Sequence, residues 1–284
     1  MSVLIYCLPA LGWGLMPVIS KKAGGDPVEQ ILGTTVAAFL VAILLNAFME
    51  VHYTTTGIVA SLISGIFWAG GQFLQFKALK QGTVSKVMPV SNGTQLVFTG
   101  ITSGLLLREW RNLQQAAITL ILMLVIVFAM VMITKKTTTI AEGTTLDYKT
   151  ILLICASSMC LVGYVTSTNF LGISGSQIFL PQATAMLASS LVITAMEKKR
   201  PRPILVSRNL LTGASWSMAN IAIFYTSTRL GVGLSYTISQ LCIIVSIIGG
   251  IVFLRERKTK SELINTAVGI VLFFASIVGL SQFK

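Results

Sequence analysis

Two stretches of this chain repeat one another about 148 residues apart, and both lie within long apolar segments. The first runs from Trp68 to Glu109 and the second from Trp216 to Glu256. A Gly, a Ser, a Gln-Leu pair and a Leu-Arg-Glu triplet recur in each, at intervals that differ by a residue or two. If the repeated unit holds five membrane helices, the second copy enters the bilayer inverted because five is odd. Inverted repeats are typical of secondary transporters, whose substrate site lies near the membrane midplane between the halves.

The composition places the chain in the membrane. It is 54% hydrophobic and 11% charged, whereas about 25% of an ordinary soluble domain is charged. Apolar runs of about 20 residues, each long enough to cross the hydrocarbon core as a helix, recur along its whole length. They predict ten transmembrane helices, at about 2–20, 31–49, 57–79, 84–107, 113–133, 149–171, 177–196, 207–228, 233–254 and 261–281.

These segments predict an all-α integral membrane protein built as two inverted five-helix repeats. The first repeat covers residues 1–134 and the second covers 149–284, with a Thr-rich linker at 135–148, and together they form a single transport domain. The first apolar run has no basic residues before it and no small-x-small cleavage site, so we expect it to be retained as a helix rather than removed as a signal peptide.

The net charge of +12 does not indicate nucleic-acid binding, because the basic residues stand singly or in short runs beside the helix ends. When loops are assigned alternately to the two sides, only four of the 21 lysines and arginines, namely Arg108, Arg111, Arg229 and Lys284, fall on one side. Basic residues accumulate in cytoplasmic loops. The distribution therefore predicts that both termini are extracytoplasmic and that the 135–148 linker is cytoplasmic.

Acidic residues are confined to loops and helix ends. The run Asp26-Pro27-Val28-Glu29 has the pattern of a helix start, with Asp as N-cap, Pro as first helical residue and Glu closing a capping box. A proton-coupling role for Glu29 is the alternative to this structural interpretation. The four cysteines fall within apolar spans and His52 is alone in a loop, so we expect no disulfide, metal, cofactor or enzymatic site.

Neutral polar side chains at membrane depth indicate a binding cavity. Trp68 and Gln72 lie one turn apart on one helix, and Trp216 and Asn220 repeat that spacing on another. Amides exchange hydrogen bonds with hydroxyl groups, and an indole presents a flat face to sugar C–H groups, so such a cavity suits a neutral polyhydroxylated ligand. The candidate substrate-binding residues are Trp13, Gln30, Trp68, Gln72, Asn92, Gln95, Gln182, Trp216, Asn220 and Gln240.

The same residues have a structural alternative. Asn and Gln in membrane helices also hold one helix to another, and Trp is enriched at membrane interfaces. Repetition in both halves favours the functional interpretation for Trp68, Gln72 and Gln95 with Trp216, Asn220 and Gln240. Gln75, Asn92 and Tyr236 lack clean counterparts in the other half, so the structural interpretation is favoured for these three residues.

Over essentially its whole length, the chain resembles the bacterial glucose/ribose uptake proteins, a ten-helix branch of the drug/metabolite transporter superfamily. The resemblance rests on Gly12-Trp13-Gly14, Gly24-Gly25, Gln30 with Gly33-Thr34-Thr35, Trp68 with Gly71-Gln72, Met88-Pro89-Val90-Ser91 with Gln95, Trp216, Asn220, Phe224-Tyr225, Ser239-Gln240 and Arg255-Glu256-Arg257. Where many relatives have Leu-Gly-Glu-Trp, this chain has Leu107-Arg108-Glu109-Trp110.

The resemblance implies uptake of a neutral monosaccharide by alternating access, with protons as the coupling ion, in the plasma membrane of a Gram-positive-type bacterium. The segment Phe179-Leu180-Pro181-Gln182-Ala183 is closer to the ribose members than to the glucose members, which favours ribose slightly. Two alternatives remain: an exporter of small metabolites or drugs with the same fold, and a non-transporting subunit of a membrane assembly. The expected partners are the sugar, protons and the lipid bilayer.

Overall fold

In the computed structural model of the chain, residues 2–106, 110, 112–135, 146–169, 171, 173 and 175–282 are described. Within these residues the secondary structure is entirely helical. The elements are α1 (Ser2–Ala23), α2 (Pro27–Phe48), α3 (Thr55–Gln81), α4 (Val84–Leu106), α5 (Leu113–Thr134), α6 (Tyr148–Asn169), the 3₁₀ turn η1 (Ser176–Ile178), α7 (Phe179–Met196), α8 (Pro203–Arg208), α9 (Leu210–Leu230), α10 (Val232–Ser239), α11 (Cys242–Phe253) and α12 (Lys260–Ser281).

Local sequence explains where several helices begin. Asp26 is the N-cap of α2 with Pro27 as its first residue, and the Glu29 carboxylate accepts a hydrogen bond from the Asp26 backbone N–H at 2.7 Å. Thr54 caps α3, and Thr259 caps α12 with Glu262 in a capping box. These side chains occupy backbone donors that have no partner inside the helix.

All ten predicted membrane segments are helical, and two of them differ in detail from the prediction. The eighth begins earlier, as α8, and turns at Asn209 into α9. The ninth was expected to be one uninterrupted helix, but it divides at Gln240 and Leu241 into α10 and α11. The Leu241 N–H bonds the Ile238 carbonyl and the Ile243 N–H bonds the Gln240 carbonyl. The turn is therefore tightened to 3₁₀ geometry, which the apolar pattern alone does not reveal.

Seven stretches among the described residues are long and apolar enough to cross a membrane. The predicted spans that fall short are those of α1, α4 and α9. Each of these three helices contributes indole or amide side chains to the lining of the cavity described below.

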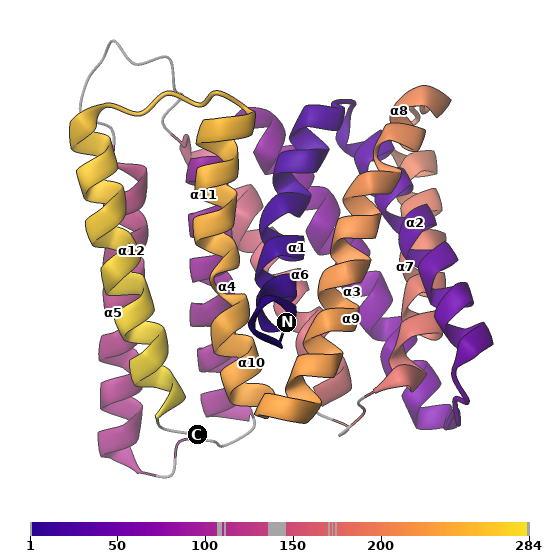
Figure 1. Cartoon of the computed structure of the whole chain (residues 1–284), viewed down its shortest axis with the longest axis horizontal. Coiled ribbons are helices and arrows are strands. Elements are labelled where there is room, and N and C mark those ends of the chain that lie inside the picture. The colour runs from indigo at the N-terminus through magenta and orange to yellow at the C-terminus, as the bar shows by residue number, and fades with distance from the viewer. Residues whose placement is uncertain are drawn as a thin grey trace.

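The helices stand side by side in one bundle (Figure 1). α5 packs against α12 at one edge, and α2 packs against α7 at the other. Between these edges, α3 packs on α6 and α1 packs on α9, while α4 contacts both α6 and α11. Elements far apart in the sequence are therefore neighbours throughout the bundle, and its centre is formed by α1, α3, α4, α6, α9 and the α10–α11 pair.

Two helix crossings bring backbone against backbone. A Cβ added to Gly65 of α3 would lie 2.3 Å from the Gln182 carbonyl oxygen of α7. A Cβ added to Gly213 of α9 would lie 2.3 Å from the Thr34 carbonyl oxygen of α2. Only glycine permits either approach, as is common where membrane helices pack closely.

Candidate functional site

The centre of the bundle contains a cavity of about 380 Å³, which lies within the size range of small-molecule sites. Its walls come from α1, α3, α4, α6, α7, α9 and the α10–α11 turn. Nine of the ten candidate residues line it: Trp13, Trp68, Gln72, Asn92, Gln95, Gln182, Trp216, Asn220 and Gln240. The structure therefore brings side chains from both halves of the sequence into one chamber.

The two repeated tryptophans meet inside this chamber. The ring centroids of Trp68 and Trp216 are 4.8 Å apart, with the rings inclined at 57°. Both side chains are buried. Burial of two large aromatic surfaces stabilises this side-chain contact between α3 and α9. The pair also presents indole surface to the cavity.

Polar groups on α3 and α4 form a connected network on one wall. The Gln72 amide donates to the Gln75 side-chain oxygen at 2.8 Å, and the Gln75 amide donates to Ser91 Oγ at 2.7 Å. Gln95 donates to the same hydroxyl at 3.1 Å. The Gln75 side chain is hydrogen-bonded at both its oxygen and its nitrogen, whereas the side-chain oxygen of Gln72 has no hydrogen-bond partner among the described residues. Gln75 therefore acts to position Gln72, and Gln72 is the better placed of the two to meet a ligand.

A second polar network joins α6, α7 and α9. Tyr164 Oη donates to the Asn220 side-chain oxygen at 3.3 Å, and the Asn220 amide donates to the Trp216 carbonyl at 2.8 Å. Gln182 donates to Ser64 Oγ at 2.7 Å, and Ser64 Oγ in turn donates to the Tyr164 carbonyl. Both polar ends of Asn220 already have protein partners, so its side chain contributes to helix packing as well as to the cavity wall.

Sequence reasoning missed several lining residues, of which Tyr164 is the most prominent. No counterpart of Tyr164 stands out in the first half, because the corresponding position on α1 is occupied by Met16, which also lines the cavity. The repeat interval could have found this face. The residue one repeat interval after Trp13 is Leu161, another residue of α6 that lines the cavity.

Gln30 and Glu29 lie outside the cavity lining. The Gln30 amide donates to the Ser20 carbonyl at 3.3 Å, between α2 and α1. Glu29 is buried and accepts three hydrogen bonds from Arg202: at 3.0 Å from its backbone N–H, at 2.8 Å from Nε and at 3.3 Å from a terminal guanidinium nitrogen. Its geometry fits the helix-start interpretation, and the coupling role stays a prediction.

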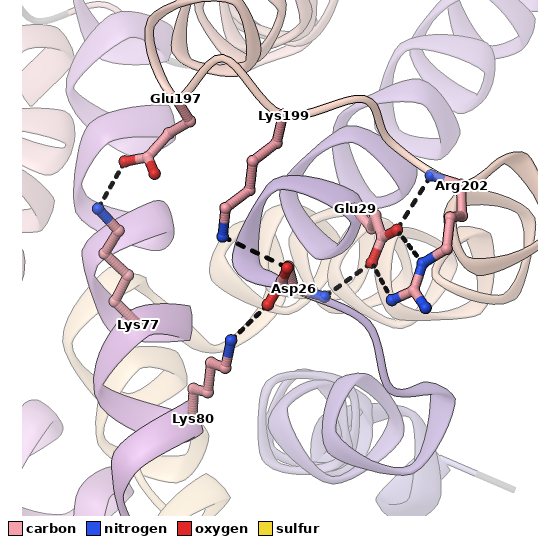
Figure 2. Close-up of polar contacts among 7 residues, drawn as sticks. All are labelled: Asp26, Glu29, Lys77, Lys80, Glu197, Lys199 and Arg202. Atoms are coloured by element: carbon pink, nitrogen blue, oxygen red, sulfur yellow. Dashed lines mark hydrogen bonds and ion pairs between the residues drawn. The ribbon is translucent and has the colours of Figure 1, made fainter.

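Glu29 belongs to a charged cluster that links the halves at one end of the bundle (Figure 2). Lys77 pairs with Glu197 at 2.6 Å, and Asp26 pairs with both Lys80 and Lys199. The hydrogen bond from Lys80 lowers the pKa of the Asp26 carboxyl. We call this end, where the α1–α2, α3–α4, α7–α8 and α11–α12 connections lie, the basic end.

The cavity lining itself carries no Asp, Glu, Lys, Arg or His among the described residues. An ionic ligand would leave water without a compensating charge, which costs several kcal/mol or more. A neutral ligand with several hydroxyls would instead find amide and phenol groups to exchange hydrogen bonds with. The geometry therefore selects for uncharged polar compounds.

A family model described as "Sugar transport protein" matches residues 4–282 of this chain. The chain belongs to that family. The match confirms the resemblance drawn from its motifs, and it makes the chain a multi-pass membrane transporter rather than an enzyme.

Relatives of this sugar transport protein match over nearly their full length. A Listeria monocytogenes protein assigned by name to sugar uptake is 38% identical, over 99% of each chain. The glucose uptake protein GlcU of Bacillus subtilis is 36% identical, over 100% of this chain and 99% of its own. One crystal structure is similar in fold, with a TM-score of 0.63 at 16% identity over 98% of this chain and 96% of that one.

Proposed function

We propose that this protein takes up a neutral monosaccharide by alternating access of its central cavity. One observation carries the proposal: an uncharged chamber of about 380 Å³ is lined by a tryptophan pair and amides from both halves. Sugars are recognised by such combinations, because hydroxyls need hydrogen-bond partners and the ring face is apolar. The names of the relatives, which describe sugar and glucose uptake, agree with this substrate class.

The proposed architecture is two five-helix repeats, 1–134 and 149–284, related by an internal two-fold axis. An axis that exchanges residues 148 apart would map the Gly65–Gln182 crossing onto the Gly213–Thr34 crossing, and both approaches have the same 2.3 Å spacing. It would also exchange α3·α6 with α9·α1, which are both close pairs. These matched contacts support the repeat. Residues 136–145 of the linker lie outside the described part of the chain.

Inversion of the second repeat is supported by the positions of equivalent connections. Asp26, in the α1–α2 connection, lies at the basic end. Gln177, after the equivalent α6–α7 connection, instead contacts Thr54 at the start of α3, which is the opposite end. Repeats of opposite orientation around a central site are the arrangement in which each half can close one side in turn.

For the sugar itself, we keep ribose and glucose as the two candidates. Phe179 and Gln182, from the segment that favours ribose, both line the cavity and could therefore contact the substrate. The name of the Bacillus subtilis relative points to glucose. Discrimination between them would depend on how the cavity accommodates the extra hydroxymethyl group of a hexose.

The test is uptake of radiolabelled ribose and glucose by a transport-deficient bacterium that expresses this chain. We expect saturable uptake that other neutral monosaccharides compete with and that sugar phosphates do not. If the cells take up no sugar but preloaded vesicles release it, the protein is the exporter of the alternative hypothesis. No flux in either direction from purified protein in liposomes would favour a non-transporting assembly subunit.

We propose proton symport with Glu29 as the coupling residue. The described cavity lining has no carboxylate, and Glu29 is a buried acid in the first turn of α2. Glu29→Gln should abolish sugar accumulation driven by a pH gradient while sparing sugar exchange across equal concentrations. Both rates are measured in proteoliposomes, with Glu197→Gln as the control acid at the same end. Accumulation that survives in Glu29→Gln would leave Glu29 as a helix cap only.

The basic end is proposed to face the cytoplasm, so that both termini are extracytoplasmic in the bacterial plasma membrane. The proposal rests on the uneven distribution of lysines and arginines. Arg200 is exposed at the basic end, and Thr228 is exposed near the opposite end of α9. In a cysteine-free background, an impermeant thiol reagent added to intact cells should label Thr228→Cys and spare Arg200→Cys. The reverse pattern would invert the orientation.

A further inference from the structure

The cavity is not equally accessible from the two ends. It reaches the end opposite the basic end, since its lining includes Ile173 and Gly175 of the α6–α7 connection. Towards the basic end, the lining stops at Pro17, Gln75 and Met88, between one and two turns inside their helices. Beyond these residues, the interior is filled by side chains that are at most 2% exposed: Ser20, Leu79, Val84 and Val87.

One carboxylate joins the two halves at the basic end, beside these buried side chains. Glu256, in the connection between α11 and α12, accepts hydrogen bonds from the backbone N–H groups of Val84 at 2.6 Å and Ser85 at 2.9 Å. These are the first two residues of α4, whose amides have no partner within the helix. A carboxylate at a helix N-terminus also gains from the helix dipole, and hydrogen bonds to an ionised acceptor are stronger than neutral ones.

The backbone around Glu256 is shaped for this contact. Arg255 has a φ of +55°, in the left-handed region that residues with a Cβ rarely adopt. The Glu256 N–H donates to the Gly250 carbonyl, and a Cβ on Gly250 would lie 2.5 Å from a Glu256 carboxylate oxygen. The carboxylate therefore passes close over Gly250, and the loop accepts unfavourable backbone geometry at Arg255 to deliver it.

The α3–α4 connection, which leads into the residues that bind Glu256, is also bound by a side chain of α1. Lys21 of α1 donates to the carbonyl oxygens of Leu79 and Gly82, the latter at 2.6 Å, where α3 ends and the turn to α4 begins. Lys258 lies in the same α11–α12 connection as Glu256. Burial and the nearby charge of Lys86 lower the pKa of Lys258 to about 8. The α3–α4 turn is thus fixed between a cation from α1 and an anion from the second half.

We propose that Glu256 holds the basic end shut on the side formed by α4 and α11. α4 and α11 contact each other and both line the cavity, so an opening between these two helices separates the start of α4 from the end of α11. That separation breaks the two hydrogen bonds to Glu256. Glu256 is a positioning residue, because it touches the gate and not the sugar. The inference rests on the alternating access proposed above.

The experiment measures opening of the gate without any sugar. Val87→Cys, in a chain whose four cysteines are replaced, places a fully buried thiol between Glu256 and the cavity. A membrane-impermeant thiol reagent is applied to vesicles whose basic end faces outward, as established by labelling of Arg200→Cys. We expect Glu256→Gln to accelerate labelling at position 87 roughly tenfold, because the amide carries no charge and keeps one acceptor oxygen, whereas the carboxylate offers a separate oxygen to each N–H group.

The matched control is Glu262→Gln. Glu262 lies near the same end, but its carboxylate accepts from Thr259 N–H at the start of its own helix, α12. Its replacement should leave labelling at position 87 unchanged. Equal labelling in both variants, or no acceleration in Glu256→Gln, would overturn the proposal.

A second variant tests the same contact from its other partner. Val84 is the first residue of α4, where proline is tolerated, and Val84→Pro removes the N–H that donates to Glu256 without changing any charge. It should accelerate labelling in the same direction, even if Glu256→Gln yields no folded protein. If the protein carried no sugar, the uptake assay would fail while this difference remained, so the two proposals fail separately.

Discussion

Gln72→Ala is expected to weaken sugar binding by roughly 5- to 150-fold while leaving the protein folded. Gln72 is buried in the cavity wall, so removing its amide leaves a sugar hydroxyl unpaired, which costs about 1–3 kcal/mol. Within the described part of the chain the Gln72 side chain bonds to Gln75 alone, and Gln75 keeps its bond to Ser91 in the variant. Helix packing should therefore persist. The measurement is the Kd of purified protein for ribose and for glucose, together with its melting temperature.

Two comparisons sharpen this prediction. Gln81→Ala changes the same residue type on the same helix, where Gln81 is exposed and bonds to Thr150 rather than lining the cavity, and it should leave affinity unchanged. Asn220→Ala should lower both affinity and melting temperature, because Asn220 also bonds to Tyr164 and to the Trp216 carbonyl. Normal affinity in Gln72→Ala would show that Gln72 does not bind the sugar.

Gly65→Ala is expected to damage the fold itself. The added methyl group would lie 2.3 Å from the Gln182 carbonyl oxygen and 2.8 Å from Ala185 Cβ, so α3 and α7 have to move apart. Overpacking of this kind costs about 1–3 kcal/mol, or roughly 2–12 °C in melting temperature. The expected result is a lower melting temperature or a loss of folded protein, measured by thermal unfolding in detergent and by gel filtration.

Gly70→Ala is the matched control for this prediction, since it makes the same change on the same helix where nothing lies within 4 Å of the new methyl group. It should be neutral or stabilising, because alanine favours a helix by about 1 kcal/mol over glycine. Gly213→Ala should reproduce the Gly65 effect if the two crossings are equivalent. An unaltered melting temperature in Gly65→Ala would show that α7 can shift freely.

The positions of the helices could be predicted from the sequence because each depends on local composition. A chain in hydrocarbon has to satisfy its backbone hydrogen bonds within each segment, so every long apolar run becomes a helix. The Asp26 cap and the indoles and amides on α3 and α9 were identifiable for the same reason: capping and helical spacing are properties of neighbouring residues.

Three features do not follow from hydropathy or helical spacing. Gln30 is polar and at membrane depth, yet its amide is directed to Ser20 and stays outside the cavity. Tyr164 joins the site because α6 packs on α3 and reaches Asn220 of α9. The tightened turn at Gln240 interrupts a segment that is predicted as one continuous apolar span.

The sequence by itself therefore determined the class of protein, the ten helical segments and the chemical character of the cavity wall. The tertiary structure alone decided which polar groups converge and that Glu256 joins the two halves over α4. The physical reason is that hydropathy fixes a helix in the membrane but not its neighbours. Which helices adjoin depends on close contacts such as that of Gly65 with Gln182, whose partners are separated by more than a hundred residues.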